Sequence, residues 1–276
     1  MGPGLFVFIT PIDTAPDSPE EGIVIWQSKS SDTRKRILGI PYDNVTCSEA
    51  LERVERFVRD EQTRIVVHLS LVYLMKARRN KNLRIFLEES DLILPCGRHI
   101  YWAAKVLKRP LKEFIDPSQF VKLLMIQSVE LGKRVYLLGG KGDTIDRAYD
   151  SLKKDIPKLF VVGKYRGNYE RGALENVVTA IGKASPDYFF IGLGSPREEI
   201  WVERYIGKIN AGIIVLVEGL FNLYAGKMGK HRKLTVDPAS GWLSKREIPH
   251  PRSYKKIWLV PVFILSVISE RLFWRH

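Results

Sequence analysis

The feature that most constrains the fold of this chain is a strand–turn–helix pattern that repeats through its middle. The stretches Val135–Gly140 and Phe190–Glu199 show it most clearly, because each runs from apolar residues into small residues and then into a helix start. In a parallel α/β sheet, such turns bring backbone N–H groups and helix N-termini to one edge, where phosphate groups bind. We therefore expect the functional site along that edge.

The same alternation extends from about Arg36 to Ala225. Apolar runs predict buried strands over residues 64–69, 91–94, 134–138, 159–162, 188–192 and 213–217. Helical spacing predicts helices between them, over residues 48–60, 72–78, 100–107, 117–131, 143–154, 170–184 and 196–208. Alternating strands and helices of this length predict an α/β fold, with a Rossmann-like, mostly parallel sheet that carries helices on both faces.

Composition divides the chain into three parts. Residues 1–35, rich in Pro, Asp and Ser, predict a loosely ordered N-terminal extension. Residues 36–226 form the expected α/β domain, which is long enough to bury a core. Residues 227–276 are a basic and aromatic appendage, which holds 11 Lys and Arg against 3 Asp and Glu, a net charge of +8.

The appendage indicates a polyanionic partner. Its apolar run, Ile257–Ile268, is too short to span a bilayer, which takes about 20 apolar residues. Basic and aromatic residues around such a run favour a segment that lies in the lipid interface, and a C-terminal helix docked on the core is the alternative. No nucleic-acid recognition motif accompanies the charge, so we expect no nucleic-acid partner. The basic residues expected at the acceptor or the membrane are Arg232, Arg246, Arg252, Lys255 and Lys256.

The cysteines indicate a reducing compartment, and the spacing of the histidines predicts no metal site. Cys47 and Cys96 provide no disulfide framework, and the five histidines lack the spacings of zinc sites. No signal sequence is recognisable at the N-terminus. We therefore expect a cytoplasmic protein that lies peripheral to the inner face of the plasma membrane.

The turn at Gly139 and Gly140 has two interpretations. It could cradle a pyrophosphate, or it could simply be a tight connection between a strand and a helix. The full G-x-G-x-x-G spacing is missing, and no acidic residue follows at the distance that would hold a ribose. The sequence therefore argues against a nicotinamide cofactor, and we expect no cofactor.

The segment from Gly192 to Glu199 is the strongest signal in the chain. Its two glycines and Ser195 leave space above a strand, and Pro196 is expected at the first position of a helix whose N-terminal amides favour an anion. Arg197 could add a bidentate phosphate contact, and Glu198 or Glu199 could accept hydrogen bonds from sugar hydroxyls. The alternative is an ordinary charged first turn, with acids favoured by the helix dipole.

The chain resembles the WecG/TagA/CpsF family of glycosyltransferases in five segments, which are Tyr73–Arg78, Leu92–Pro95, Leu137–Gly140, Pro186–Trp201 and Gly219–Gly226. The resemblance implies an inverting, metal-independent enzyme. Such an enzyme moves an N-acetylmannosamine-type sugar from a UDP donor to a polyprenyl-diphosphate-linked acceptor, in surface-polysaccharide or lipid-linked glycan assembly. The resemblance also implies that a basic C-terminal appendage acts at the membrane.

The chain departs from this family where the acceptor would be activated. The family's Pro-Asp-Gly triplet supplies a general base, and Cys96 occupies the position of that aspartate here. His99, three residues on, or His68, at the end of the neighbouring strand, could replace it, because an unperturbed imidazole titrates near pH 6.5. Asp116 is another candidate, with the N-cap of the following helix as its ordinary role.

Other family positions also differ. The family has Thr-x-Asn where this chain has His68–Ser70, and it has Glu-Arg-x-x-Gly-x-Asp where this chain has Glu113–Gln119. Glu198 stands in place of a glutamine, and Asn222 in place of an aspartate. The positions expected to bind substrate are Ser70, Gly97, Gly139, Gly140, Gly194, Ser195, Pro196, Arg197, Glu198, Glu199 and Asn222.

Two classes of function are therefore in contention, and a structural role without a ligand is a third alternative. The first is a divergent transferase whose partners are a nucleotide-sugar, a polyprenyl-diphosphate-linked glycan and the membrane surface. The second is a binding protein that keeps affinity for the nucleotide-sugar or the lipid diphosphate without transfer. A homo-oligomer is compatible with either class.

Overall fold

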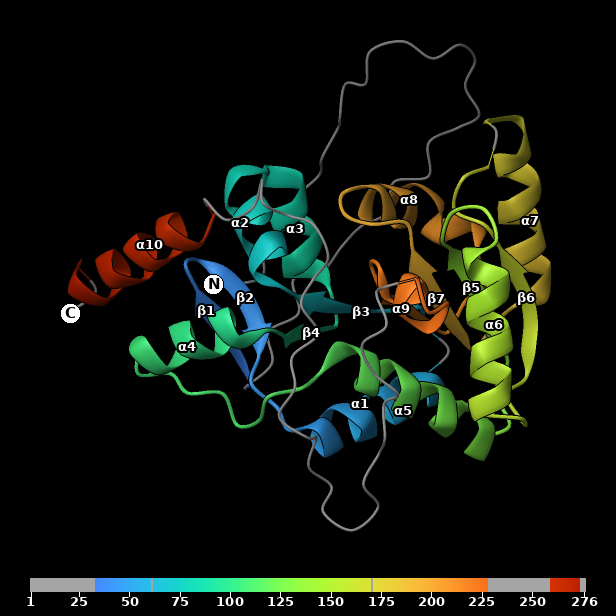
Figure 1. Cartoon of the computed structure of the whole chain (residues 1–276), viewed down its shortest axis with the longest axis horizontal. Coiled ribbons are helices and arrows are strands. Elements are labelled where there is room, and N and C mark those ends of the chain that lie inside the picture. The colour runs from blue at the N-terminus through green and yellow to red at the C-terminus, as the bar shows by residue number, and fades with distance from the viewer. Residues whose placement is uncertain (1–32, 61, 170, 228–258, 274–276) are drawn as a thin grey trace, which may run out of the picture.

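The computed structural model describes residues 33–60, 62–169, 171–227 and 259–273. It contains a six-stranded parallel sheet with the strand order β4-β3-β8-β7-β5-β6 (Figure 1). The predicted α/β fold class is therefore confirmed. In chain order, the strands are β3 Arg64–Leu69, β4 Leu92–Pro95, β5 Val135–Gly139, β6 Val161–Tyr165, β7 Tyr188–Gly192 and β8 Ile213–Leu216.

Helices cover both faces of the sheet, because alternate residues of each buried strand point to opposite sides. Each face has a hydrophobic core of its own. One core includes α2 Leu71–Arg79, α3 Lys81–Glu89, α4 Arg98–Val106, α7 Leu174–Ala184 and α8 Arg197–Tyr205. The other includes α1 Cys47–Arg59, α5 Pro117–Glu130, α6 Thr144–Asp155 and α9 Leu220–Tyr224.

Several helix starts follow from local sequence. Thr46 and Glu49 form a capping box at the start of α1. Asp116 caps α5 by accepting hydrogen bonds from the backbone N–H groups of Ser118 and Gln119. The expected helix over residues 196–208 begins one residue late, because Pro196 is its N-cap and Arg197 its first residue.

The structure also holds elements that the sequence patterns missed. An antiparallel hairpin, β1 Arg34–Ile37 and β2 Ile40–Asp43, precedes the parallel sheet, and α3 follows directly on α2. The sixth strand begins at Val161 rather than residue 159, because Leu159 is held in a turn by a hydrogen bond to the Ile156 carbonyl. A short 3-10 turn, η1 Arg171–Ala173, replaces the start of the helix expected from residue 170, and another, η2 Ile206–Lys208, follows α8.

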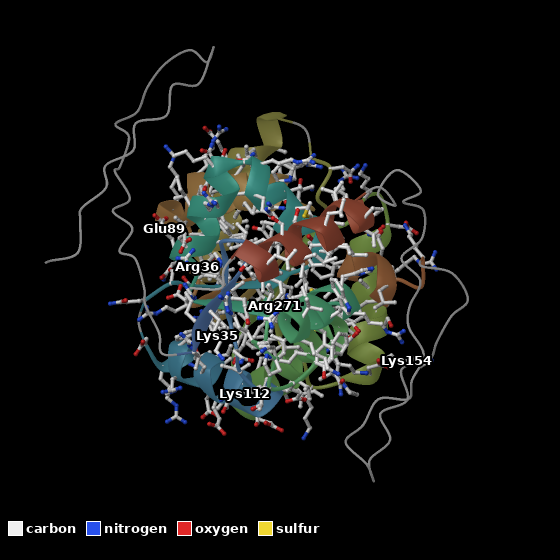
Figure 2. All side chains as sticks on the ribbon, turned by 90° about the vertical axis from the view of Figure 1, so that its left-hand side faces the viewer. Lys35, Arg36, Glu89, Lys112, Lys154 and Arg271 are labelled. Atoms are coloured by element: carbon white, nitrogen blue, oxygen red, sulfur yellow. The ribbon has the colours of Figure 1, made fainter. Side chains whose placement is uncertain are left out.

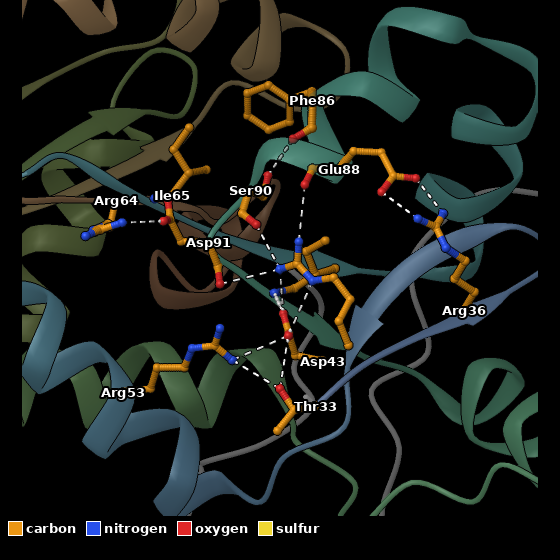
Figure 3. Close-up of polar contacts among 12 residues, drawn as sticks. Thr33, Arg36, Asp43, Arg53, Arg64, Ile65, Phe86, Glu88, Ser90 and Asp91 are labelled. Carbon is orange, nitrogen blue, oxygen red and sulfur yellow. Dashed lines mark hydrogen bonds and ion pairs between the residues drawn. The ribbon is translucent and has the colours of Figure 1, made fainter. Parts of the chain in front are cut away.

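A buried carboxylate fastens the hairpin to the sheet (Figure 3). Asp43 is fully buried and pairs with Arg34 at 3.0 Å and Arg53 at 3.4 Å. Its Oδ2 atom also accepts a hydrogen bond from the Ile93 backbone in β4, at 2.8 Å. A buried charge is tolerated only when it is paired and hydrogen-bonded in this way. The hairpin is therefore part of the folded domain.

The C-terminal helix α10, Leu259–Phe273, lies against α4 and the hairpin (Figures 1 and 2). Phe263 and Val267 are fully buried, and Glu270 accepts a hydrogen bond from the Leu38 backbone at 2.7 Å. On the other side of the helix, Leu265 and Leu272 are 67% and 66% exposed. Of the two alternatives for this segment, the C-terminal helix docked on the core is therefore present. The role in the lipid interface stays a prediction.

None of the helices in the described ranges is long and apolar enough to cross a membrane. Most of the appendage lies in residues 228–258, outside the described part of the chain. The basic residues predicted to contact the acceptor or the membrane all fall there, namely Arg232, Arg246, Arg252, Lys255 and Lys256.

Candidate functional site

The carboxyl ends of the parallel strands meet at one edge of the sheet. Ser70 follows β3, Gly97 follows β4, Gly140 follows β5, Gly194 follows β7 and Glu218 follows β8. In open α/β sheets, ligands bind in the crevice outside these ends. The predicted site residues therefore lie at a common edge, although they belong to separate parts of the sequence.

The glycines at this edge serve two different purposes. A Cβ atom on Gly139 would lie 2.5 Å from the Gly192 carbonyl oxygen, and one on Gly140 would lie 2.8 Å from the Thr144 Cβ atom. These two glycines are required by close packing of strand, turn and helix. In contrast, Gly97 and Gly194 have φ values of +89° and +79° with open space around the missing Cβ atom. Their turns leave room for a ligand at the backbone.

The Gly139–Gly142 turn is tied to the loop that follows β6. Gly167 N–H donates to the Gly140 carbonyl at 2.8 Å, and Gly142 N–H donates to the Asn168 side chain at 3.1 Å. Arg197, which is exposed, donates from its guanidinium to the Gly167 carbonyl at 3.1 Å. The guanidinium predicted to contact phosphate is thereby held beside the first glycine turn.

Glu198 occupies the second glycine turn from inside. Its Oε2 atom accepts hydrogen bonds from the N–H groups of Leu193 at 3.2 Å and Gly194 at 3.1 Å. The residue is fully buried, and its Oε1 atom has no hydrogen-bond partner. Burial, followed by the charges of Glu199 and Glu218, raises the pKa of Glu198 well above its usual value. The second amide cradle thus already holds an acidic side chain.

Glu199 lies in a second buried polar cluster, between α8 and α2. Burial raises its pKa, and the nearby hydroxyls of Ser195 and Tyr73 partly offset that rise. These hydroxyls lie close to the carboxylate, yet neither they nor the carboxylate oxygens complete a hydrogen bond of standard geometry. Lys76 donates to the Ser195 carbonyl at 2.7 Å. The cluster can therefore accept or donate further hydrogen bonds, as a sugar with several hydroxyls would require.

Cys96, at the position of the family base, is poorly suited to accept a proton. Its side chain is buried, with 7% of the residue exposed. Burial, and then the charges of Glu218 and Asp116, raises the pKa of the thiol. The thiol therefore stays neutral at physiological pH, and only a thiolate is an effective base or nucleophile.

His68 is held in one tautomer. Its Nδ1 atom lies 3.2 Å from the Leu216 carbonyl oxygen, and because a carbonyl only accepts, Nδ1 carries the proton. Nε2 is then a lone-pair acceptor, and it is buried without a partner. Burial lowers the pKa of His68, which keeps the ring neutral, and Phe120 packs against it edge-on. The ring is chemically a base but is enclosed.

His99 differs from His68 in its access to the edge. It is exposed in the first turn of α4, two residues after the open turn at Gly97. Of the two histidines that could replace the carboxylate, His99 is the one that a bound acceptor can reach without movement of the core.

The remaining predicted residues have structural partners. Ser70 caps α2 by accepting from the Tyr73 N–H at 3.2 Å, and Asn222 lies in α9 with its side-chain amide 3.4 Å from the Gly219 carbonyl. Whether these residues also bind substrate stays a prediction. Across the described residues, no cluster of His, Cys, Asp and Glu could hold a metal ion.

Sequence reasoning missed three residues at this edge, which are Tyr73, Lys76 and Glu218. Tyr73 and Lys76 belong to one of the segments that carry the family resemblance, so that segment contained a usable signal. Glu218 has a positive φ of 45°, two residues after the end of β8. A non-glycine residue in this conformation is uncommon, and nothing in the local sequence indicated it.

The chain is similar to several curated proteins of one kind. Three curated relatives carry the name N-acetylglucosaminyldiphosphoundecaprenol N-acetyl-beta-D-mannosaminyltransferase. The relative from Bacillus spizizenii is 23% identical over 230 residues, which cover 78% of this chain and 88% of the relative. Those from Staphylococcus aureus (strain NCTC 8325 / PS 47) and Bacillus subtilis (strain 168) are also 23% identical, and cover 89% and 85% of this chain and 96% and 91% of the relatives.

A family profile also matches most of the chain. The profile described as "Glycosyl transferase WecG/TagA/CpsF family" matches residues 35–276. This range includes the hairpin except for Arg34, the whole parallel sheet and α10. The chain therefore belongs to the WecG/TagA/CpsF family of glycosyl transferases.

Proposed function

We propose that this chain transfers an N-acetylmannosamine-type sugar from a UDP donor to a polyprenyl-diphosphate-linked acceptor in the assembly of a cell-envelope glycan. The observation that carries the proposal is the family match over residues 35–276. The names of the relatives support the sugar and the lipid-linked acceptor. The UDP donor follows from the family resemblance that the glycine turns indicated.

We assign the donor to the edge formed by the turns after β5 and β7. Arg197 supplies a cation for the diphosphate, and the open turn at Gly194 lets the backbone approach it. The acceptors of Glu199, with Ser195 and Tyr73 beside them, are as enclosed as His68 Nε2, so a sugar hydroxyl would reach them only if this part of the edge opened. The donor side is therefore built from backbone and from a few buried polar groups.

We assign the acceptor to the edge formed by β3, β4 and α4. In an inverting transfer, the acceptor oxygen bonds to the anomeric carbon while the bond to UDP breaks, and the hydroxyl proton passes to a base. His99 is our choice for that base, because it is exposed beside the open turn at Gly97. His68 Nε2 is enclosed, and the Cys96 thiol stays protonated.

We also propose that the enzyme works at the membrane surface. The exposed apolar side chains of α10, Leu265 and Leu272, together with the positive charge of the appendage, suit an anionic lipid surface. Co-sedimentation of the full chain with vesicles that contain anionic lipid tests this point. Leu265→Glu should lower the bound fraction, and unchanged binding would contradict the role of α10.

A binding protein without transfer is the second candidate, and the neutral, buried Cys96 favours it. One experiment separates the two candidates. The purified chain is incubated with UDP-N-acetylmannosamine and a GlcNAc-diphosphate polyprenyl lipid, and the lipid product is measured by mass spectrometry. We expect a product one N-acetylhexosamine heavier, and a loss of about 10²-fold or more in rate for His99→Ala.

Lys105→Ala, on the same helix as His99, is the matched control and should keep its rate. Thermal stabilisation by UDP without any lipid product would favour the binding protein. Transfer that survives in His99→Ala but not in His68→Ala would move the base to His68.

A further inference from the structure

The amides most suited to an anion are taken in the free protein by an acidic side chain. Glu198 Oε2 accepts from both Leu193 N–H and Gly194 N–H, at 3.2 and 3.1 Å. Two adjacent N–H groups that converge on one oxygen form the kind of concavity that binds phosphate in other proteins. Nothing lies within 4 Å of the position that a Cβ atom on Gly194 would take, so the loop that carries these amides borders open space at the edge of the sheet.

The surroundings make this arrangement costly for a charged carboxylate. Glu198 faces Glu199 on its own helix, Glu218 at the end of β8, and the Tyr73 hydroxyl of α2. Lys76 is the nearby cation, and its amine donates to the Ser195 carbonyl. Glu198 Oε1 has no partner although the side chain is fully buried. A fully buried carboxylate with one unpaired oxygen is poorly stabilised where it lies.

We propose that Glu198 is an internal stand-in for the ligand's phosphate: its carboxylate occupies the Leu193 and Gly194 amides, and it must give them up, which it does more readily when neutral, before a nucleoside diphosphate binds there. This inference rests on the proposed function, and it deepens it by naming the residue that limits donor affinity. Glutamine, the residue of the resembled family at this position, has the same shape but no charge, so it would hold these amides less strongly and would not repel a diphosphate.

The proposal predicts that UDP binding takes up a proton. Above the pKa of Glu198 the carboxylate is ionised, and it both competes for the amides and repels the diphosphate. Below that pKa the acid is neutral and repels the ligand less. Because the pKa of Glu198 is raised in the folded protein, the change falls above the usual range of a carboxyl group. The affinity for UDP should therefore decrease as pH rises.

Calorimetric titration with UDP tests the proposal, with the wild-type chain and Glu198→Gln compared from about pH 6.5 to about pH 8.5. The terminal phosphate of UDP titrates near pH 6, and this contribution is common to both proteins. We expect Glu198→Gln to bind UDP about tenfold tighter at the upper end of the range, because a like-charge contact has been removed. Its affinity should change little across the range.

Glu175→Gln, an exposed acid in the first turn of α7, is the charge-matched control and should behave as wild type. If Glu198→Gln does not fold, titrations of the wild-type chain in buffers of different ionisation enthalpy report proton uptake directly. Wild-type affinity that stays constant with pH, or binding without proton uptake, overturns the inference alone. No UDP binding by either protein at any pH overturns the donor-site assignment as well.

Discussion

The two halves of the sheet are held together in different ways. Where β5 and β7 end, the backbones approach most closely, and Gly139 and Gly192 touch where a single methyl group would not fit. On the side of β3 and β4, buried charges carry the contacts: Asp43 pairs with two arginines, and Asp91 pairs with Arg64 at 3.1 Å. The first half forms our proposed donor edge, and the second our proposed acceptor edge.

This difference shows where the chain could diverge and still fold. The donor edge includes the turn at Gly139 and Gly140, which tolerates no side chain, so that part of its geometry belongs to the fold itself. The acceptor edge depends on side chains such as Cys96 and His99, which no packing requirement ties to one chemistry. A change from carboxylate to thiol at residue 96 leaves the sheet intact, although it alters the proton acceptor.

The largest effect on stability is expected beside β3 and β4, where the buried ion pairs lie. Asp43→Ala leaves Arg34 and Arg53 without their buried partner, and should lower the free energy of unfolding by about 3–5 kcal/mol. Urea denaturation measures the change. Glu88→Ala, which breaks a more exposed pair with Arg36, is the control and should lose no more than about 1 kcal/mol. Equal losses in the two variants would contradict our description of this half.

The acceptor edge should regain a base when a carboxylate returns to residue 96. In a His99→Ala background, Cys96→Asp should raise the rate of transfer by about 10²-fold, whereas Cys96→Ser should not. Because Glu218 and Asp116 act on this position, the rescued rate should increase with pH. Product formation by mass spectrometry measures the rate. Equal rates for the Asp and Ser variants would show that the acceptor edge lacks more than a base.

The stability of the sheet where β5 and β7 end should be sensitive to the addition of one methyl group. Gly139→Ala should cost about 1–3 kcal/mol of stability, because the new Cβ atom meets the Gly192 carbonyl. Gly194→Ala meets no atom, so only its positive φ of 79° opposes the substitution, at a cost of about 1 kcal/mol. Thermal melting ranks the two variants. The reverse order would mean that the close contact at Gly139 does not hold this half together.

The smallest effect is a dependence of stability on pH. Glu198 and Glu199 have raised pKa values in the folded chain, so between their unfolded and folded values the folded protein binds more protons than the unfolded one. Stability is then greatest below the unfolded value, near 4.5, and decreases as pH rises through the folded value. Glu199→Gln should flatten this decrease when urea midpoints are compared. An unchanged slope would show that Glu199 is ionised in the folded protein.

The strands of the parallel sheet were predicted well, because apolar runs and helix caps can be recognised within a few neighbouring residues. The strands at residues 64–69 and 188–192 have the predicted bounds, and Asp116 caps α5 as its spacing suggested. The hairpin over residues 34–43 was missed because its pairing depends on Asp43 reaching Ile93, fifty residues away.

The candidate site was predictable only in part. The turn at Gly194 was recognisable from its sequence, as were the histidines near the base position. That Glu198 would turn back onto the amides of its own loop could not be read from the helical pattern, which places it in an ordinary first turn. The enclosure of His68 likewise depends on Leu216 and Phe120, which are distant in sequence.

Hydrogen exchange with and without excess UDP, near pH 6.5 and resolved by peptide, most directly tests our claim that the donor edge still binds a nucleotide diphosphate. We predict slower exchange in the two turns, residues 139–142 and 193–199, with little change around residues 96–99. Unchanged exchange in both turns, or protection confined to another part of the chain, would contradict the account.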